Sequence, residues 1–451
     1  MGYLMKNRFK IVLFLVINSL FYIYSDVTTD LSVRKIEEIL QYGIESEVVT
    51  TLKEIGSDPK EDILSKVFSR YKDSLLLDTK IAFIDYFSNT KTLPSYILDS
   101  IYNDASSDII ERRLKSSLIN CLGKKGGIRE GNFLLAMLDN YDNIIKNIAA
   151  DAISKMKVKE LAKPLLDRMI LSDDNSEKFL SNDIKTKLVN YFGENKSEEA
   201  IPYLKKIVSS KETEKFLKMF SMVALLKIGD ASSIDIIAEN LKDGDIKIQE
   251  YAAYALSLFK NRDALLYLRK MLLHNNENVR IYAIQGIYLN EDYESLTPIV
   301  YKFRNDPSKK VQDEALMTLL YFGEKGIDCL KDFFKGKKYN SSQIFTISKA
   351  VAQKPNQAGV DYLLKIYLEL DKKDREVVAR NIVNSSSNLV DPIIKELLRS
   401  SDYLIRIGAI KSVYTIEKST LWEDVENIAK NDPVETVKIN ARRFLDMRKT
   451  N

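Results

Sequence analysis

Three consecutive segments decide the fold: IKIQEYAAYAL at 246–256, ENVRIYAIQGI at 277–287 and KKVQDEALMTL at 309–319. Each contains an apolar residue followed by a long polar one, then a small residue three positions on and an apolar residue seven positions on. Apolar residues at this spacing lie on one face of an α-helix. The segments therefore predict a helix that recurs every 31 or 32 residues.

The same pattern extends along almost the whole chain when the long polar residue is called position zero. We place position zero at Val49, Lys80, Glu111, Lys146, Lys185, Lys218, Gln249, Arg280, Gln312, Ile344, Glu376, Arg406 and Lys438. The steps between them are 31, 31, 35, 39, 33, 31, 31, 32, 32, 32, 30 and 32 residues. Position +3 is apolar in twelve of thirteen cases, and position +7 fails only at Gly56. Such self-similarity predicts a repeat array.

A second amphipathic helix is expected after each of these helices. EEAIPYLKKIV at 198–208 and LVDPIIKELL at 389–398 are typical. Proline occurs early in several of them, where its missing N–H has no helical acceptor to lose: Pro164, Pro202, Pro298 and Pro392. Asp306-Pro307 and Asp432-Pro433 precede two of the first helices, where aspartate is expected to cap the helix.

An apolar–Arg/Lys–x–x–Ala helix at this spacing, often after Asp-Pro, resembles the short bacterial type of HEAT-like repeat. The best matches are 217–319 and 404–445. The resemblance implies an all-α fold, an α-solenoid of about 13 two-helix repeats over residues 26–448. It implies little about function, because one fold hosts many roles.

Two interpretations of position zero remain open. Alanine at +3 lets neighbouring helices approach, and the long polar residue is expected to bond to its own or its neighbour's turn and form a ladder. The alternative is a line of cations that binds acidic ligands, although Glu111, Gln249, Gln312 and Glu376 interrupt it.

The N-terminus has the composition of an export signal. Residues 1–10 are basic, and 11–24 form an apolar run of 14 residues, shorter than the roughly 20 that span a bilayer. We predict a signal peptide or an N-terminal anchor over residues 1–25, and hence a periplasmic protein or one tethered to the outer face of the inner membrane. Residues 449–451 are expected to be a tail.

Charge argues against nucleic-acid binding. Beyond residue 25 the chain carries 68 − 3 = 65 basic and 64 acidic side chains. Duplex-binding proteins usually carry a basic excess. We therefore expect protein partners in the cell envelope, no nucleic acid, and membrane contact only if the N-terminal segment is uncleaved.

Catalytic and metal-binding patterns are absent from the sequence. The one histidine, His274, is expected to cap a helix C-terminus, and HEAT-like metal hydroxylases, which resemble this fold, need paired His-Glu motifs. Cys121 and Cys329 are expected to be small buried hydrophobes rather than a disulfide. The glycine-rich stretch 123–127 follows no strand, so a turn between helices is favoured over a phosphate loop. No cofactor is expected.

Two irregularities mark a candidate binding surface. The steps of 35 and 39 place extra residues near 123–131 and 172–183, which form either a binding loop or a tolerated insertion. Phe220, Tyr251 and Tyr282 occupy position +2 of three consecutive repeats, with Tyr254 and Tyr288 on the same helices. These aromatics are either an interface or the edge of the core. The sequence favours a non-enzymatic interaction scaffold, with a HEAT-like lyase or DNA glycosylase as the alternative.

Overall fold

The computed structural model describes residues 33–107, 109–174, 178–335 and 338–450. These residues form 26 α-helices and several short 3-10 turns, with no strand among them. Contacts divide the chain into two compact units, Met1–Tyr191 and Phe192–Asn451, and the boundary falls within one helix, α11. The all-α fold and the HEAT-like solenoid architecture are confirmed.

The first unit contains nine complete helices. They are α2 (Val33–Tyr42), α3 (Glu45–Ile55), α4 (Leu64–Asp73), α5 (Leu77–Asn89), α6 (Ser95–Ser106), α7 (Arg112–Lys125), α8 (Ile128–Ala136), α9 (Asn143–Lys155) and α10 (Ala162–Asp174), and α11 (Asn182–Asn195) contains the boundary.

The second unit contains sixteen complete helices. They are α12 (Ile201–Ser209), α13 (Lys215–Ile228), α14 (Ile234–Glu239), α15 (Ile246–Leu258), α16 (Arg262–Met271), α17 (Glu277–Leu289), α18 (Leu296–Asn305), α19 (Lys309–Tyr321), α20 (Glu324–Phe334), α21 (Ser341–Gln353), α22 (Gln357–Glu369), α23 (Lys372–Ile382), α24 (Asp391–Leu398), α25 (Tyr403–Thr415), α26 (Trp422–Asn431) and α27 (Glu435–Thr450).

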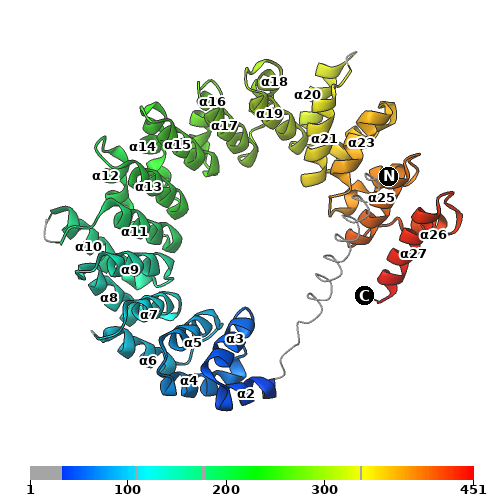
Figure 1. The fold of residues 1–451 in the computed structure, drawn as a ribbon. Coiled ribbons are helices and arrows are strands. Elements are labelled where there is room, and N and C mark those ends of the chain that lie inside the picture. Colours follow the sequence, from blue (N-terminus) through cyan, green and yellow to red (C-terminus); the bar gives the residue numbers. More distant parts are fainter. Residues whose placement is uncertain (1–32, 108, 175–177, 336–337, 451) are drawn as a thin grey trace, which may run out of the picture. The chain divides into compact units, whose positions relative to one another are not determined.

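Helices of each unit are arranged in two layers. In the first unit α3, α5, α7 and α9 pack side by side, and in the second unit α13, α15, α17, α19, α21, α23, α25 and α27 do the same (Figure 1). The even-numbered helices form the other layer, in which α2 contacts α4, α12 contacts α14 and α20 contacts α22. Each helix pair therefore buries its apolar face against its neighbours, as repeat arrays require.

The N-caps of three helices show that the position-zero residue assigned from the sequence is wrong in those repeats. In the first-layer helices whose N-cap is defined, position zero is usually the fourth residue after it, as for Arg280 after Asn276 and Arg406 after Asp402. Glu111 is itself the N-cap of α7, so Lys115 replaces it. By the same rule Val48 replaces Val49 and Arg375 replaces Glu376. The sequence misplaced these three because their neighbours also carry long or apolar side chains.

The corrected register makes the packing pattern complete. Position +7 becomes apolar in every repeat, because Ile55 replaces Gly56. Twelve of these thirteen side chains are buried, and only Leu445, on the last helix, is half-buried. The alanines at +3 are fully buried where first-layer helices meet, as at Ala252, Ala283 and Ala315.

Position zero forms the expected ladder of hydrogen bonds. The Arg280 guanidinium donates from Nη1 to the backbone oxygens of His274 and Asn275, at 2.7 and 2.8 Å, in the turn before its own helix. Its Nε and Nη2 donate to both carboxylate oxygens of Asp306, at 2.8 and 2.7 Å, in the turn of the next repeat.

Other repeats use parts of the same device. Arg406 bonds in the same manner to the oxygens of Ser400 and Ser401 and to both oxygens of Asp432. Lysine and glutamine make one of these contacts: Lys115 reaches the oxygen of Ser107, Lys218 reaches Asp243, and Gln249 and Gln312 reach the oxygens of Asp243 and Asp306. The structural interpretation of position zero is therefore confirmed for these repeats.

The Asp-Pro turns differ from the capping prediction. The N-cap of α19 is Ser308, and Asp306 lies two residues earlier, where it accepts the N–H of Ser308 at 3.0 Å. Asp432 accepts the N–H of Val434 in the same way. The prediction that these aspartates cap the helices was wrong. Their carboxylates lie in the turn before the helix and accept hydrogen bonds from the arginine of the preceding repeat.

These buried aspartates predict an acid-sensitive fold. Burial alone would raise the pKa of Asp306, but hydrogen bonds from Arg280 and Ser308 outweigh it and hold the pKa below its usual value of 3.8. A carboxyl whose pKa is lowered by folding stabilises the protein above the unfolded pKa and loses that contribution as the pH falls. We expect stability to fall between about pH 5 and pH 3. Urea unfolding across this range should show a smaller pH dependence in Asp306→Asn than in the unsubstituted protein; equal dependence would contradict the assignment.

One predicted insertion lies elsewhere in the structure, and one predicted turn is shorter than expected. Gly123, Lys124 and Lys125 belong to α7, so only Gly126 and Gly127 form the turn. A Cβ on Gly123 would lie 2.9 Å from the Cα of Ala152, so glycine is required where α7 crosses α9 closely. In the corrected register the 35-residue step ends at Lys115, which places the extra residues before α7 rather than near 123–131. The other insertion lies between α10 and α11, and residues 175–177 are outside the described part.

Several expectations concern the chain ends and the cysteines. The export segment 1–25 and Asn451 lie outside the described residues, while α27 includes residues 449 and 450. Among the described residues, no helix has the length and apolar character needed to span a bilayer. Both cysteines are free thiols; Cys121 is buried as expected, whereas Cys329 is only half-buried.

Candidate protein-binding surface

Three of the predicted tyrosines form one cluster. Tyr251 and Tyr254 lie on α15, and Tyr282 lies on the neighbouring helix α17. The ring of Tyr254 stands between the other two, with centroids 6.5 Å from Tyr251 and 5.7 Å from Tyr282 in edge-to-face geometry. We call these three residues the tyrosine cluster. Position +2 supplies two of them, and Tyr254, one turn further along α15, connects them.

The tyrosine cluster is open to solvent. Tyr254 is 38% exposed, and the other two are half-buried. Their hydroxyl groups make no hydrogen bond to the described part of the chain, whereas buried Tyr71 and Tyr86 bond to Asp104 and to the Lys60 oxygen. An apolar ring with a free hydroxyl is a typical contact group in protein interfaces.

A polar rim borders the tyrosine cluster. Glu250 accepts hydrogen bonds from Lys247 at 2.7 Å, from Asn278 at 2.7 Å and from Asn276 at 3.3 Å. Burial opposes ionisation of Glu250, but these bonds outweigh it and lower the pKa. Burial, followed by the charge of Glu250, raises the pKa of Tyr282. The rim is therefore a carboxylate held in place by three donors beside the tyrosine rings.

Tyr288 belongs to a different aromatic group. Its ring centroid lies 5.7 Å from that of Tyr321 and 5.5 Å from that of Phe322, and the ammonium of Lys354 lies over the rings of Tyr288 and Tyr321, at 5.1 and 4.9 Å. Burial and the nearby Glu314 raise the pKa of Tyr321 to about 12. Most of these residues fall outside positions +2 and +3 of the repeat, so the sequence pattern did not connect them with Tyr288.

Phe220 is the predicted residue that joins neither group. It is half-buried on α13, and no ring pair includes it within the described ranges. The predicted row therefore divides into the tyrosine cluster, the group around Tyr288, and an isolated Phe220. A shared repeat position places residues on equivalent faces, but the side chains meet only where a ring such as Tyr254 fills the gap between helices.

His274 uses both ring nitrogens for structural contacts. Nε2 lies 3.1 Å from the oxygen of Leu241, in the 3-10 turn Asn240–Lys242 of the preceding repeat, and Nδ1 accepts the N–H of Asn276 at 3.1 Å. It therefore caps the end of the previous second helix rather than its own. Within the described ranges, no group of three or more His, Cys, Asp or Glu side chains has metal-binding geometry.

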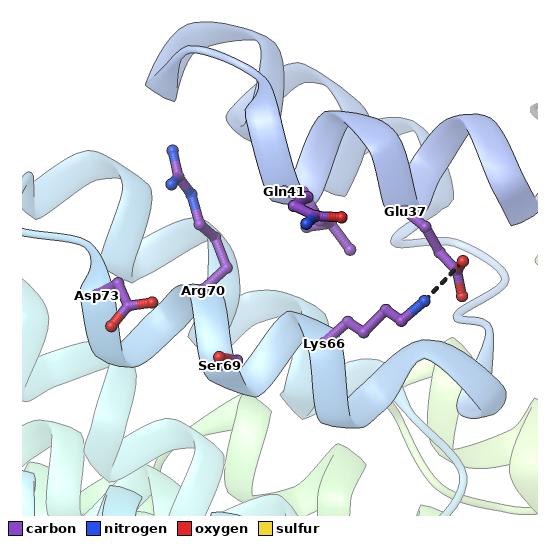
Figure 2. A pocket seen from close by; sticks show the side chains of 7 residues that line it. Glu37, Gln41, Lys66, Ser69, Arg70 and Asp73 are labelled. Carbon is purple, nitrogen blue, oxygen red and sulfur yellow. Dashed lines mark ion pairs between the residues drawn. The ribbon is translucent and has the colours of Figure 1, made fainter.

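A polar hollow lies between α2 and α4 in the first unit. Figure 2 shows Lys66 of α4 reaching Glu37 of α2, with which it forms an ion pair of 2.7 Å. Arg70, from the next turn of α4, donates to the Gly43 oxygen and to Glu45 at 3.1 and 3.4 Å. Because these cations already have carboxylate partners, the hollow is a weaker candidate than the tyrosine cluster.

Comparisons with known proteins give partial likenesses. No family model matches the chain. A segment of 82 residues is 37% identical to a deoxyhypusine hydroxylase from Debaryomyces hansenii, covering 18% of this chain and 26% of that protein. The chain thus matches about a quarter of this curated relative's length.

The solved structures to which this chain is similar match it at TM-scores below 0.5. A Kap121p mutant matches 93% of this chain and 54% of its own, with 11% identity and a TM-score of 0.43. Importin beta matches 88% of this chain and 59% of its own, with 10% identity and a TM-score of 0.45. Human deoxyhypusine hydroxylase matches 63% of this chain and 98% of its own, with 16% identity and a TM-score of 0.26. The packing of its own helices gives this chain an all-α fold of stacked two-helix units, the HEAT-like solenoid architecture.

Proposed function

We propose that this protein is a non-enzymatic scaffold that binds protein partners along its helical layers, and that the tyrosine cluster is a contact surface. The observation that carries the proposal is the geometry of the tyrosine cluster: the exposed ring of Tyr254 contacts both half-buried rings, Tyr251 and Tyr282, and no hydroxyl of the three bonds to the described residues. Aromatic residues that cluster at a surface are enriched in the energetic centres of interfaces. The partner is a protein of the cell envelope.

Replacing Tyr251 and Tyr282 by alanine separates binding from folding. Because these residues lie in the proposed interface, their replacement should reduce the affinity for a co-purified partner by at least tenfold, since central aromatic contacts contribute about 2 kcal/mol or more. The melting temperature should change little. Affinity is measured by titration calorimetry and folding by circular dichroism.

The matched control is Tyr301→Ala. Tyr301 lies on α18 in the other layer and is 61% exposed, so this substitution also removes a surface tyrosine. We expect this control to bind like the unsubstituted protein. Loss of folding in the double variant would instead make Tyr251 and Tyr282 part of the core edge and would refute the proposed surface.

Export is the second part of the proposal and rests on the composition of residues 1–25. The protein is then periplasmic, or tethered to the outer face of the inner membrane. Cell fractionation tests this: recovery with the envelope or periplasmic fraction supports it, and recovery from the cytosol alone refutes it.

The alternative is an enzyme of the HEAT-like type. The 82-residue likeness to deoxyhypusine hydroxylase favours it, although a chain with the single histidine His274 cannot supply paired His-Glu motifs. We expect the purified protein to contain less than stoichiometric transition metal by elemental analysis. A stoichiometric transition metal that survives dialysis would favour the enzyme over the scaffold.

A further inference from the structure

Three repeats carry arginine at the corrected position zero: Arg280, Arg375 and Arg406. In two of them the residue 26 positions later is an aspartate of an Asn-Asp-Pro turn, and it binds the guanidinium through both oxygens. The step from Arg375 to Arg406 is one residue shorter, so the equivalent position is +25, where Ser400 accepts the N–H of Asp402 at 3.2 Å as Asp306 accepts that of Ser308. The ladder therefore lacks its carboxylate at this one arginine.

The Arg375 guanidinium is left incompletely bonded. Nη2 donates to the oxygen of Leu368 at 2.9 Å, and the group lies 5.3 Å from the ring centroid of Tyr367. Nε is enclosed by protein and has no hydrogen-bond partner within the described ranges. A buried donor without a partner is rare and costly in native structures.

Other arginines with an unpartnered Nε differ in one respect. Arg70 and Arg168 share that feature, but each contacts a carboxylate through Nη2, from Glu45 and Asp139 respectively. Arg375 forms no ion pair in the described part of the chain. It is also half-buried, so water screens its charge less than it screens an exposed one.

A cavity of about 380 Å³ opens beside Arg375, between α22, α23, α24 and α25. Ser400 and Ser401 lie on one of its walls, in the turn that holds aspartate in the other two repeats. The cavity is large enough for a carboxylate with its neighbouring atoms, whereas the equivalent space beside Arg280 is filled by Asp306, whose side chain is fully buried.

The charges around the cavity select the kind of anion. Its charged lining residues are Lys372, Arg375, Arg399, Glu376, Glu396 and Asp402. The three cations and three carboxylates balance, and Arg399 is already paired with Glu396 at 3.1 Å. A phosphate dianion would meet three carboxylates, whereas a single carboxylate matches the planar fork of one arginine.

We propose that this cavity, which we call the Arg375 pocket, binds a carboxylate supplied from outside the repeat ladder, and that Arg375 is the residue that binds it. The terminal nitrogens of Arg375 donate to the carboxylate from the cavity, because Nε is enclosed by protein. The source is either a free carboxylic acid or the acidic side chain of a protein. The proposal does not depend on the tyrosine cluster.

The test follows the Nε–H signal of Arg375 by NMR in the full chain with ¹⁵N-labelled arginine, at constant ionic strength. The probes are acetate and the peptide acetyl-Asn-Asp-Pro-Val-amide, which copies residues 431–434 of this chain. Arg375→Gln assigns the signal by removing it. We expect a saturable shift with at least one probe, and the probe that saturates at lower concentration identifies the source. No saturable shift with either probe would overturn the proposal.

Two variants make the test specific. Ser400→Asp supplies the missing carboxylate, so it should abolish the shift and raise the melting temperature. Arg380→Gln removes an exposed arginine from the same helix α23 and should leave the shift unchanged. Should Ser400→Asp fail to fold, the rise in melting temperature on adding acetate is compared instead: it should persist in Arg380→Gln and disappear in Arg375→Gln. An equal response in both would overturn the proposal.

Discussion

Replacing Arg280 by methionine is expected to lower the free energy of unfolding by about 3–5 kcal/mol, because it leaves a buried carboxylate without its principal partner. The Asp306 side chain is fully buried, and among the described residues its carboxylate would keep only the ammonium of Lys302, at 3.3 Å, and the N–H of Ser308, at 3.0 Å. The backbone oxygens of His274 and Asn275 would also each lose the hydrogen bond that Arg280 donates to them.

The measurement for Arg280→Met must be local as well as global. Repeat arrays can unfold in parts, so a single midpoint is insufficient. Urea unfolding is therefore combined with hydrogen exchange of α17 and α19. Lys310→Met is the control, because Lys310 forms an ion pair with Glu277 while 71% exposed, and such pairs contribute up to about 1 kcal/mol. An Arg280 effect no larger than this control would contradict the ladder as a source of stability.

Replacing Ala283 by leucine is expected to destabilise the array by about 1–3 kcal/mol, because a larger side chain must enter a close-packed layer. Ala283 is fully buried on α17, which packs between α15 and α19. One turn further, a Cβ on Gly286 would lie 2.9 Å from the Cα of Ser257 on α15. The backbones of these helices are therefore too close for a leucine.

A size series tests the packing at Ala283. Ala283→Ser adds one atom and should lower the melting temperature less than Ala283→Val, and Ala283→Leu should lower it most. Leu266, which is 59% exposed on α16, shows that leucine is tolerated at the surface of the preceding repeat. An unchanged melting temperature in Ala283→Leu would refute the close packing of the first layer.

The repeat and its helix pairs were predictable because they depend on periodicity, which the sequence displays directly. Steps of 31 or 32 residues and alanine at Ala252, Ala283 and Ala315 predict close-packed first-layer helices, as the structure has them. The errors at Val49, Glu111 and Glu376 arose where apolar or long polar residues are adjacent. There, only the N-cap fixes which residue faces the neighbouring repeat.

The candidate sites were less predictable because they depend on contacts between repeats. The sequence register placed Glu111 and Glu376 at position zero, where they interrupt a cationic line. In the second case Arg375, the neighbouring residue, was therefore not identified as position zero. Its missing carboxylate becomes apparent only when the bond from Arg280 to Asp306 shows what the residue two positions before the next first-layer N-cap does. The division of the aromatic row likewise depends on Tyr254, whose contact with Tyr282 crosses from α15 to α17.

The most direct test of the scaffold proposal is site-specific photocrosslinking in the cells that produce the protein. A photoreactive phenylalanine analogue is placed at Tyr254, in the tyrosine cluster, and separately at Tyr301, in the other layer. We predict a discrete protein adduct from position 254 that Tyr251→Ala/Tyr282→Ala abolishes, and none from position 301. No adduct from position 254, or the same adducts from both positions, would contradict a partner-binding surface at the tyrosine cluster.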